Sequence, residues 1–411
     1  MSSPSRREFL GASAAMLALN PSLESLLPYA AKAPLNVAVI GVGRQGRAIL
    51  TELGKIAGVK IVALVDGSKG RLDAGLRRAQ GAEGFASHKE MLDKVKSVEA
   101  VFVATPTHLH REPVVDALSA GKHVYCEAPL AHSMDDLVAI TKAARASKTL
   151  FQSGMGARSN PIYQLARTFV RSGTLRTMAT VRAQYRKKMS WRFPAPTPAE
   201  ENDVNWRLNP DVSLGLIGEV GVSQFDAVHW FLNAYPVSVR ATGAVRLHQD
   251  GRKVADTVAC EMMFADGVRF AYDATIANSF EGAYELYTGE MASIKLAWNA
   301  GWMFKEADAP TQGWEVYANR EQFHDEQGIT LIADATKLAA QNKLKDGVGL
   351  PEPPLYYPVA DFVRSVTESK PSVCSADEGY RSGLVVLAAH QALMTGTEQK
   401  LSEQAFKELP K

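Results

Sequence analysis

The fold is decided by a strand-like run and a glycine motif that follow one another without a gap: Leu35-Asn36-Val37-Ala38-Val39-Ile40 and Gly41-Val42-Gly43-Arg44-Gln45-Gly46. The first run is apolar and β-branched, as in parallel strands buried on both faces. In such a unit the first glycine permits the tight turn, the second lets the backbone approach a diphosphate, and the third lets helix and strand pack closely. Because residues 47–53 have the composition of a helix, the stretch predicts a dinucleotide-binding unit.

A second predicted strand, at residues 60–65, ends at Asp66, twenty residues after Gly46. A carboxylate at this place can accept both ribose hydroxyls and would repel a 2′-phosphate. We therefore expect NAD as the cofactor, with NADP less favoured. Lys69 and Arg71 lie close enough in the sequence to weaken that preference.

Strands and helices continue to alternate after this point. Residues 100–105 and 123–126 are predicted strands, with a helix at 112–120 between them. This alternation predicts an α/β fold with a doubly wound parallel sheet, whose ligands lie at the carboxyl ends of the strands. The predicted cofactor-binding residues are Gly41, Gly43, Arg44, Gln45, Gly46, Asp66, Thr105, Pro106, His108, Glu127 and Ala128.

The first 33 residues are predicted to be a targeting signal rather than part of the fold. The arginine pair in Ser5-Arg6-Arg7-Glu8-Phe9-Leu10 precedes a short apolar stretch, a pattern typical of a twin-arginine (Tat) export signal. We therefore expect a periplasmic or otherwise exported protein that is a client of the Tat machinery. Pro34 disfavours cleavage directly after Ala33, so cleavage and retention of the signal both stay open.

Composition bounds the partners. The 411 residues suggest about two domains. The formal net charge of +2 disfavours a nucleic-acid partner. No apolar run reaches the roughly 18 residues of a membrane span, so none is expected in the mature protein. The three cysteines, Cys126, Cys260 and Cys374, lack the spacing of a disulfide framework or a zinc site, and we expect no metal.

Beyond residue 34 the chain resembles the glucose–fructose oxidoreductase / inositol dehydrogenase / MocA (Gfo/Idh/MocA) family. The resemblance rests on the order and spacing of the glycine motif, residues 105–110 (Thr-Pro-Thr-His-Leu-His), 121–130 (Gly-Lys-His-Val-Tyr-Cys-Glu-Ala-Pro-Leu), 158–161 (Arg-Ser-Asn-Pro) and 215–232. It implies a Rossmann domain at 34–155 and an α+β domain at 156–355 with a large open, mainly antiparallel sheet. It also implies terminal helices at 356–411 that pack back on the core.

The sequence is compatible with such a sheet. Predicted strands lie at residues 178–185, 237–246, 257–264, 268–276, 284–288 and 291–296. Two predicted helices lie at 357–368 and 378–394. We interpret residues 308–354, which include Trp314, as a long connection that covers the site or mediates contacts in an expected homo-oligomer.

Two residues depart from the family pattern at the chemical centre. The resemblance implies a lysine where this chain has Ala128, and a histidine where it has Ser223; Glu219 stands at the position of an aspartate. Both usual proton-handling groups are therefore missing. The catalytic candidates that remain are Glu219, Ser223, His108 and His229, of which Glu219 and Ser223 would share one helical stripe with Asp226 and Trp230.

An insertion at residues 185–206 is dense in Arg, Lys, Trp and Pro. It is either a solvated loop or a wall whose aromatic faces stack on sugar rings. The predicted substrate contacts are Arg158, Tyr185, Lys187 and Trp206, and Lys187 or Lys188 is a candidate for the missing amine.

Three functions stay open at this point. The first is an exported NAD-dependent oxidoreductase that acts on a sugar, cyclitol or sugar derivative with a tightly held cofactor. The second is an NAD-dependent glycosidase that works by transient oxidation and elimination, with no net redox change. The third is a non-catalytic binding protein loaded with a dinucleotide, which the loss of the lysine and histidine would explain.

Overall fold

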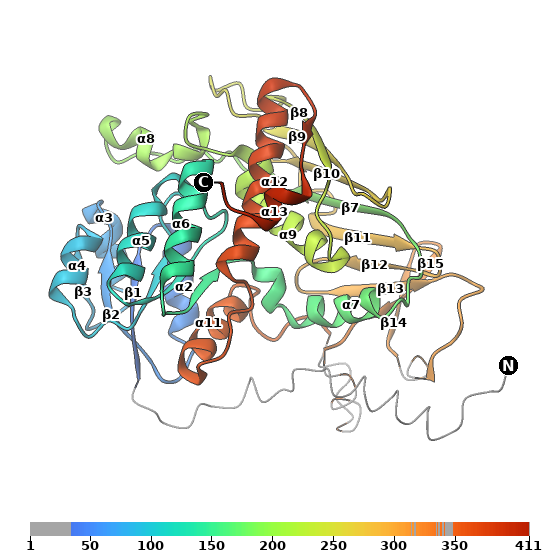
Figure 1. Ribbon diagram of the computed structural model, residues 1–411, viewed down its shortest axis with the longest axis horizontal. Helices are drawn as coiled ribbons and strands as arrows, with labels where there is room; N and C mark the ends of the chain where they lie inside the picture. Colours follow the sequence, from blue (N-terminus) through green and yellow to red (C-terminus); the bar gives the residue numbers. More distant parts are fainter. Residues whose placement is uncertain are drawn as a thin grey trace.

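The computed structural model describes residues 34–313, 315, 318–333, 335, 338, 341 and 348–410. The expected export signal at 1–33 and Trp314 lie outside the described residues. The described chain forms two sheets with their covering helices, arranged side by side (Figure 1).

The first sheet has six parallel strands in the order β3-β2-β1-β4-β5-β6. The strands are β1 (Leu35–Ile40), β2 (Val59–Val65), β3 (Glu83–Phe85), β4 (Ala100–Val103), β5 (His123–Cys126) and β6 (Phe151–Ser153). The helices between them are α2 (Arg44–Leu53), α3 (Lys69–Leu76), α4 (His88–Lys94), α5 (Arg111–Ser119) and α6 (Met134–Ala146). The predicted doubly wound sheet is confirmed, and the strand order reverses between β1 and β4, which is where such sheets bind ligands.

Strand β1 is buried on both faces, as its apolar run requires. Val37 and Val39 point into one core cluster, while Ala38 and Ile40 point into the cluster on the other face. Helix α11 (Tyr356–Glu368) contributes Val359 to the first of these clusters. The carboxy-terminal end of the chain therefore packs back on the dinucleotide-binding half.

The second sheet has ten strands in the order β14-β15-β13-β12-β11-β7-β10-β9-β8-β16. They are β7 (Met178–Arg186), β8 (Ser238–Ala244), β9 (Thr257–Met263), β10 (Arg269–Thr275), β11 (Ala283–Gly289), β12 (Ala292–Leu296), β13 (Gly301–Lys305), β14 (Arg320–Phe323), β15 (Glu326–Thr330) and β16 (Gln399–Lys400). Only the pairing of β10 with β7 is parallel among the described ladders. The expected large, mainly antiparallel sheet is confirmed.

One sequence-based expectation about this sheet is wrong. The segment 308–354, interpreted as a connection, contains the hairpin of β14 and β15 at the sheet edge. These strands are short and polar, and every residue of β14 is half-buried or exposed. An edge strand of this kind lacks the apolar alternation by which strands are predicted.

Helices cover one face of this sheet. They are α7 (Pro161–Arg171), α9 (Gly221–Leu232) and α12 (Ala376–Thr395), with the short α13 (Glu403–Lys407) at the end of the chain (Figure 1). Helix α12 joins the two halves, since Tyr380 packs in a core cluster of the first sheet and Val385 in the core of the second. Within the described parts of the chain, no helix is long and apolar enough to cross a membrane.

The segment between β7 and α9, residues 187–215, is here named the strap. It contains two 3₁₀ turns, Pro198–Glu200 and Trp206–Leu208, and the short helix α8 (Glu201–Val204). In Figure 1, α8 lies on the side of the molecule that holds the first sheet. The strap therefore leaves the second sheet and reaches across to the dinucleotide-binding half.

Candidate functional site

The glycine turn after β1 has the geometry that its motif requires. Gly41 has a φ of +84°, and a Cβ added there would lie 2.7 Å from the backbone nitrogen of Thr105. A Cβ on Gly46 would lie 1.9 Å from the carbonyl oxygen of Gly41, whereas a Cβ on Gly43 would meet nothing within 4 Å. The first and third glycines thus permit close packing, and the second leaves open space for a ligand.

The amino end of helix α2 lies at this turn. The helix begins directly after Gly43, and no side chain caps its amino end. The first N–H groups of such a helix have no partner within it and carry the positive end of the helix dipole. The turn therefore fits a diphosphate without further rearrangement.

Asp66 lies at the end of β2 and is held in place by three donors. Its carboxylate accepts hydrogen bonds from the backbone nitrogens of Val42 (3.0 Å) and Ser68 (2.9 Å) and from Arg71 Nε (2.9 Å). A carboxylate has about four lone-pair sites, so it can still accept a ribose hydroxyl. Arg71 stays partly exposed beside it, as the sequence position suggested.

The loop after β4 is fixed by a buried histidine. The ring nitrogens of His110 lie 2.9 Å from the carbonyl oxygen of Thr105 and 3.2 Å from that of Leu130. Burial lowers the pKa of His110 to about 4. The neutral ring therefore positions the loop that carries Pro106 and His108.

Glu219 brings a carboxylate of the second half to this loop. It lies in a π-helical turn, Leu216–Val220, directly before α9. Its Oε2 accepts a hydrogen bond from Thr107 Oγ1 at 2.9 Å, and its Oε1 accepts one from the backbone nitrogen of Leu214 at 3.3 Å. Burial raises the pKa of Glu219, and the nearby charge of Arg207 opposes that rise.

His108 faces the same region from the β4 loop. Its ring centroid lies 5.7 Å from that of Trp206 in the strap and 6.0 Å from that of His132. Burial lowers the pKa of His108, so the ring is neutral near pH 7. The β4 loop, the strap and the turn before α9 thus meet beside the point where the strand order reverses.

Glu127 follows β5 and links to the glycine turn. Its Oε1 accepts hydrogen bonds from Gln45 Nε2 (3.1 Å) and from the hydroxyl of Tyr125 (3.3 Å). Burial raises the pKa of Glu127 to about 7. Its neighbour Ala128 packs against the apolar core of the second half, so a methyl group occupies the position where the resemblance implies a lysine.

Two predicted site residues are placed elsewhere. Arg158 is 4% exposed and forms ion pairs with Asp226, at 2.8 Å, and with Glu378. Ser382 Oγ donates a further hydrogen bond to Asp226. The structure does not support a substrate contact for Arg158, because its guanidinium is engaged in the interior.

His229 is likewise an interior residue. It is 2% exposed, with its ring 5.1 Å from that of Tyr235 and 6.3 Å from that of Phe264. Burial lowers its pKa to about 4. A replacement base must reach the substrate, and this ring does not, so the geometry argues against that role. The helical stripe predicted from Glu219 onward is also interrupted, since Glu219 lies in the π turn and Asp226 in the core.

Other predicted contacts are near the site or open to solvent. Tyr185 is half-buried at the end of β7. Burial raises its pKa, and the nearby charge of Arg207 opposes that rise. Ser223 is half-buried in the first turn of α9. Lys187 is exposed at the start of the strap, where its backbone nitrogen donates to the carbonyl oxygen of Thr275.

Sequence reasoning missed Arg207. Its guanidinium lies 4.4 Å from the ring centroid of its neighbour Trp206, and its charge acts on both Glu219 and Tyr185. The available signal was the Trp-Arg pair at the end of an insertion dense in aromatic and basic residues. Only the fold shows that this pair, rather than Lys187, reaches the site.

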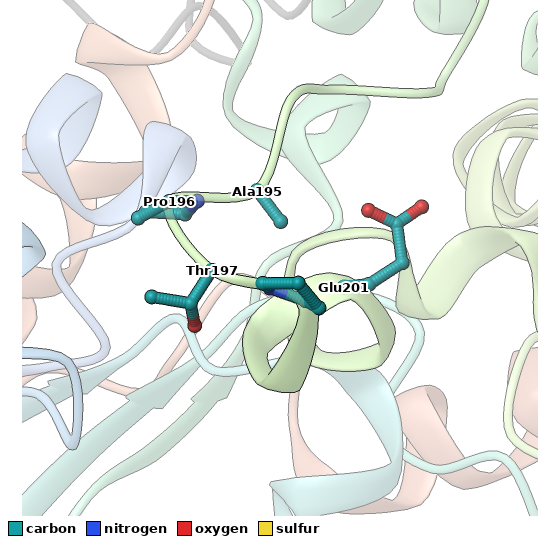
Figure 2. A pocket seen from close by; sticks show the side chains of 5 residues that line it. Ala195, Pro196, Thr197 and Glu201 are labelled. Carbon is teal, nitrogen blue, oxygen red and sulfur yellow. The ribbon is translucent and has the colours of Figure 1, made fainter.

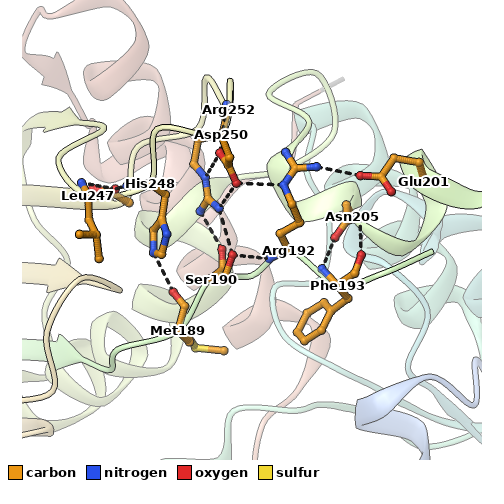
Figure 3. Close-up of polar contacts among 11 residues, drawn as sticks. Met189, Ser190, Arg192, Phe193, Glu201, Asn205, Leu247, His248, Asp250 and Arg252 are labelled. Atoms are coloured by element: carbon orange, nitrogen blue, oxygen red, sulfur yellow. Dashed lines mark hydrogen bonds and ion pairs between the residues drawn. The ribbon is translucent and has the colours of Figure 1, made fainter. Parts of the chain in front are cut away.

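The strap is anchored at both halves, and Figure 3 shows its polar contacts on the second half. On the second half, Arg252 pairs with Asp250 at 2.6 Å and donates to the carbonyl oxygen of Ser190 at 2.7 Å. Hydrogen bonds from Arg252 and Arg192 lower the pKa of Asp250. On the first half, the guanidinium carbon of Arg44 lies 4.6 Å from the ring centroid of Phe193, so the strap touches the glycine turn.

Figure 2 shows a shallow hollow formed by the strap alone. Its lining residues are Ala195, Pro196, Thr197, Pro198 and Glu201. It brings together one carboxylate and small or proline side chains, without the convergent polar groups of a reaction site. The candidate site is therefore the junction around Glu219.

A Rossmann sheet with this glycine turn, joined to a second half built on a large open sheet, defines a class of dinucleotide-dependent oxidoreductases. The chain belongs to the Gfo/Idh/MocA family. The family's NAD-binding Rossmann-fold domain matches residues 35–155, and its carboxy-terminal domain matches residues 163–295. Together these matches cover more than half of the chain, and the cofactor is NAD.

Individual relatives are distant in sequence. The chain is 22% identical over 371 residues to a myo-inositol 2-dehydrogenase of Thermotoga maritima, covering 90% of this chain and 99% of that protein. It is 26% identical over 265 residues to a 2,7-anhydro-N-acetylneuraminate hydratase of Escherichia coli, covering 64% and 67%. Among solved structures, a levoglucosan dehydrogenase in complex with NADH and levoglucosan superposes with a TM-score of 0.72 at 18% identity, covering 90% of this chain and 100% of the other. At that identity the likeness shows the fold alone.

Proposed function

We propose that this chain is an exported, NAD-dependent oxidoreductase that acts on a sugar, cyclitol or sugar derivative while holding its cofactor tightly. One observation carries the proposal: the 2.9 Å hydrogen bond from Thr107 to Glu219, which links a half-buried carboxylate to the edge of the Rossmann sheet where the strand order reverses. Sugar and cyclitol dehydrogenases among the sequence relatives support the substrate class.

Bound NAD supplies the hydride acceptor. Glu219 then takes the proton of a substrate hydroxyl while the hydrogen on the same carbon leaves as hydride, so that the C–O bond becomes C=O. Burial raises the pKa of Glu219, which makes it a stronger proton acceptor than an exposed carboxylate. The Thr107 hydroxyl holds the orientation of Glu219, and we expect Ser223 and His108 to contact other hydroxyls of the substrate.

The strap supports tight retention of the cofactor. Because Phe193 lies against Arg44 of the glycine turn, a diphosphate bound at that turn would leave only after the contact opens. Retention suits the export signal expected at residues 1–33, because free dinucleotide is scarce outside the cytoplasm. Cell fractionation tests the export, and the substitutions Arg6→Lys and Arg7→Lys are expected to keep the protein in the cytoplasm. Light scattering tests the expected homo-oligomer.

A second candidate is cleavage of a glycosidic bond by transient oxidation and elimination, after which the hydride returns. A relative named as a hydratase favours chemistry without net redox change in this family. A retained cofactor is sufficient for such a reaction, because each turnover restores it. The same residues would serve, with Glu219 as the proton acceptor in the oxidation step.

The test starts with the protein as purified from its native host. Denaturation should release NAD, identified by chromatography and mass; release of no dinucleotide, together with no uptake of added NAD by calorimetry, would sink the proposal. Incubation with aldoses, cyclitols and aryl glycosides then separates the functions. Cofactor reduction supports the oxidoreductase, aglycone release without reduction supports the glycosidase, and binding without turnover supports a binding protein.

A further inference from the structure

Arg207 differs from the other shielded arginines of this protein. In the described chain, each other arginine that is buried or half-buried donates a hydrogen bond to a carboxylate or a carbonyl oxygen: Arg47, Arg71, Arg158, Arg167, Arg186, Arg252, Arg364 and Arg381. Arg207 is half-buried, yet its one described contact is the face of Trp206. Five N–H donors on this guanidinium are thus left without an acceptor among the described residues.

The surroundings of Arg207 are those of the candidate site. The Trp206 ring contacts the guanidinium of Arg207, at 4.4 Å from its centroid, and the ring of His108 in the β4 loop, with the two ring centroids 5.7 Å apart. The residue before His108 is Thr107, which holds Glu219 at 2.9 Å. Burial raises the pKa values of Glu219 and Tyr185, and the nearby charge of Arg207 opposes both rises. Among the described contacts Arg207 forms no ion pair with either residue, so its guanidinium stays available to a ligand.

Resting on the function proposed above, we infer that Arg207 binds a carboxylate of the substrate, which makes the substrate class the sugar acids. A planar guanidinium matches the two oxygens of a carboxylate in a paired geometry. A phosphate monoester carries nearly twice the charge of a carboxylate. Arg207 is a single cation packed against Trp206, so its charge matches a carboxylate better. Placed between Glu219 and the substrate carboxylate, Arg207 also relieves the repulsion between these two negative charges.

The test compares matched acids and neutral sugars on the NAD-loaded protein. Calorimetry would measure the Kd of glucuronate against glucose, galacturonate against galactose, and gluconate against sorbitol. We expect an acid to bind about 10- to 100-fold more tightly than its neutral partner, the range for one charged hydrogen-bonded pair. Arg207→Met should abolish that preference and leave binding of the neutral sugar unchanged, and Arg207→Lys should keep part of it.

The matched control is Arg182→Met, an exposed arginine of strand β7, which should leave the preference intact. The inference is overturned if no acid binds more tightly than its neutral partner, or if Arg207→Met weakens both equally, since the arginine would then serve only to position Glu219. A stronger preference for glucose 6-phosphate over glucose than for the acids also overturns it. Each of these results leaves bound NAD in place, whereas absence of NAD would count against the proposed function itself.

Discussion

Arg158 and Arg207 are both shielded from solvent, but their guanidinium groups differ in their hydrogen-bond partners. Arg158 lies between the helices of the second half, where each of its three guanidinium nitrogens donates a hydrogen bond to Asp226 or Glu378. Arg207 lies at the junction of the two halves, where its one contact among the described residues is the face of Trp206. A saturated buried charge holds a fold together, whereas a shielded charge without an acceptor is available to a ligand.

The largest expected effect is on stability, from replacing Arg158. Arg158→Met should lower the free energy of unfolding by about 3–5 kcal/mol, because it leaves Asp226, which is 0% exposed, without its counter-ion. Urea denaturation followed by circular dichroism measures it. Arg145→Met, which breaks an exposed pair with Asp377, should cost about 1 kcal/mol or less. Equal midpoints for the two variants would remove the contrast between the regions.

Glu219→Gln tests the open side of the comparison. The amide keeps the shape of the side chain but accepts a proton poorly, so turnover should fall by about 10²- to 10⁴-fold. Bound NAD and the unfolding midpoint should stay as in the unmodified protein. The exposed Glu281→Gln is the matched control, and an E219Q protein with undiminished turnover would exclude Glu219 as the proton acceptor.

Asp66→Ala should weaken NAD binding by about 10- to 100-fold, since it removes a charged acceptor for the ribose hydroxyls. It also releases Arg71, so the ratio of NADP to NAD affinity should rise. Fluorescence titration of the cofactor-stripped protein measures both constants. Asp73→Ala, on the exposed side of α3, serves as the control, and an unchanged NAD constant for D66A would contradict the assigned ribose contact.

The sequence predicted the parts of this contrast that are local. The glycine turn and the strands of both sheets follow from short patterns, whose periodicity and φ requirements are written in adjacent residues. The two arginines could not be told apart in this way. The partners of Arg158 lie 68 and 220 residues away in the sequence. The lack of an acceptor for Arg207 among the described residues depends on how the strap crosses to the first half.

The helical stripe that linked Glu219 with Asp226 was mistaken for a related reason. It assumed uniform α-helical spacing, but a π turn at Leu216–Val220 precedes α9 and rotates Glu219 relative to the residues that follow. Single π turns occur often at functional sites. The presence of a π turn depends on tertiary packing. The sequence could therefore identify the catalytic candidates by residue type, but it could not predict which of them lie together in space.

The pH dependence of turnover connects the two charges at the junction. If Glu219 must be ionised to accept a proton, turnover rises with pH through the pKa of this carboxyl. Arg207 holds that pKa down against the effect of burial. Arg207→Met should therefore move the rising limb to higher pH, while Arg182→Met should not move it. A limb that stays in place in R207M would separate the two groups electrostatically.

The smallest expected effect concerns the strap. Phe193→Ala removes the aromatic face from Arg44, a cation–π contact worth about 0.5–2 kcal/mol. Release of NAD should accelerate by roughly 2- to 30-fold, measured as the fraction retained after gel filtration at increasing times. Phe280→Ala is the control, because Phe280 is 70% exposed. Faster release in F193A with an unchanged unfolding midpoint would show that the strap restrains the cofactor and is not needed for the fold; unchanged release would leave the anchoring of the strap through Arg192, Asp250 and Arg252 as a purely structural device.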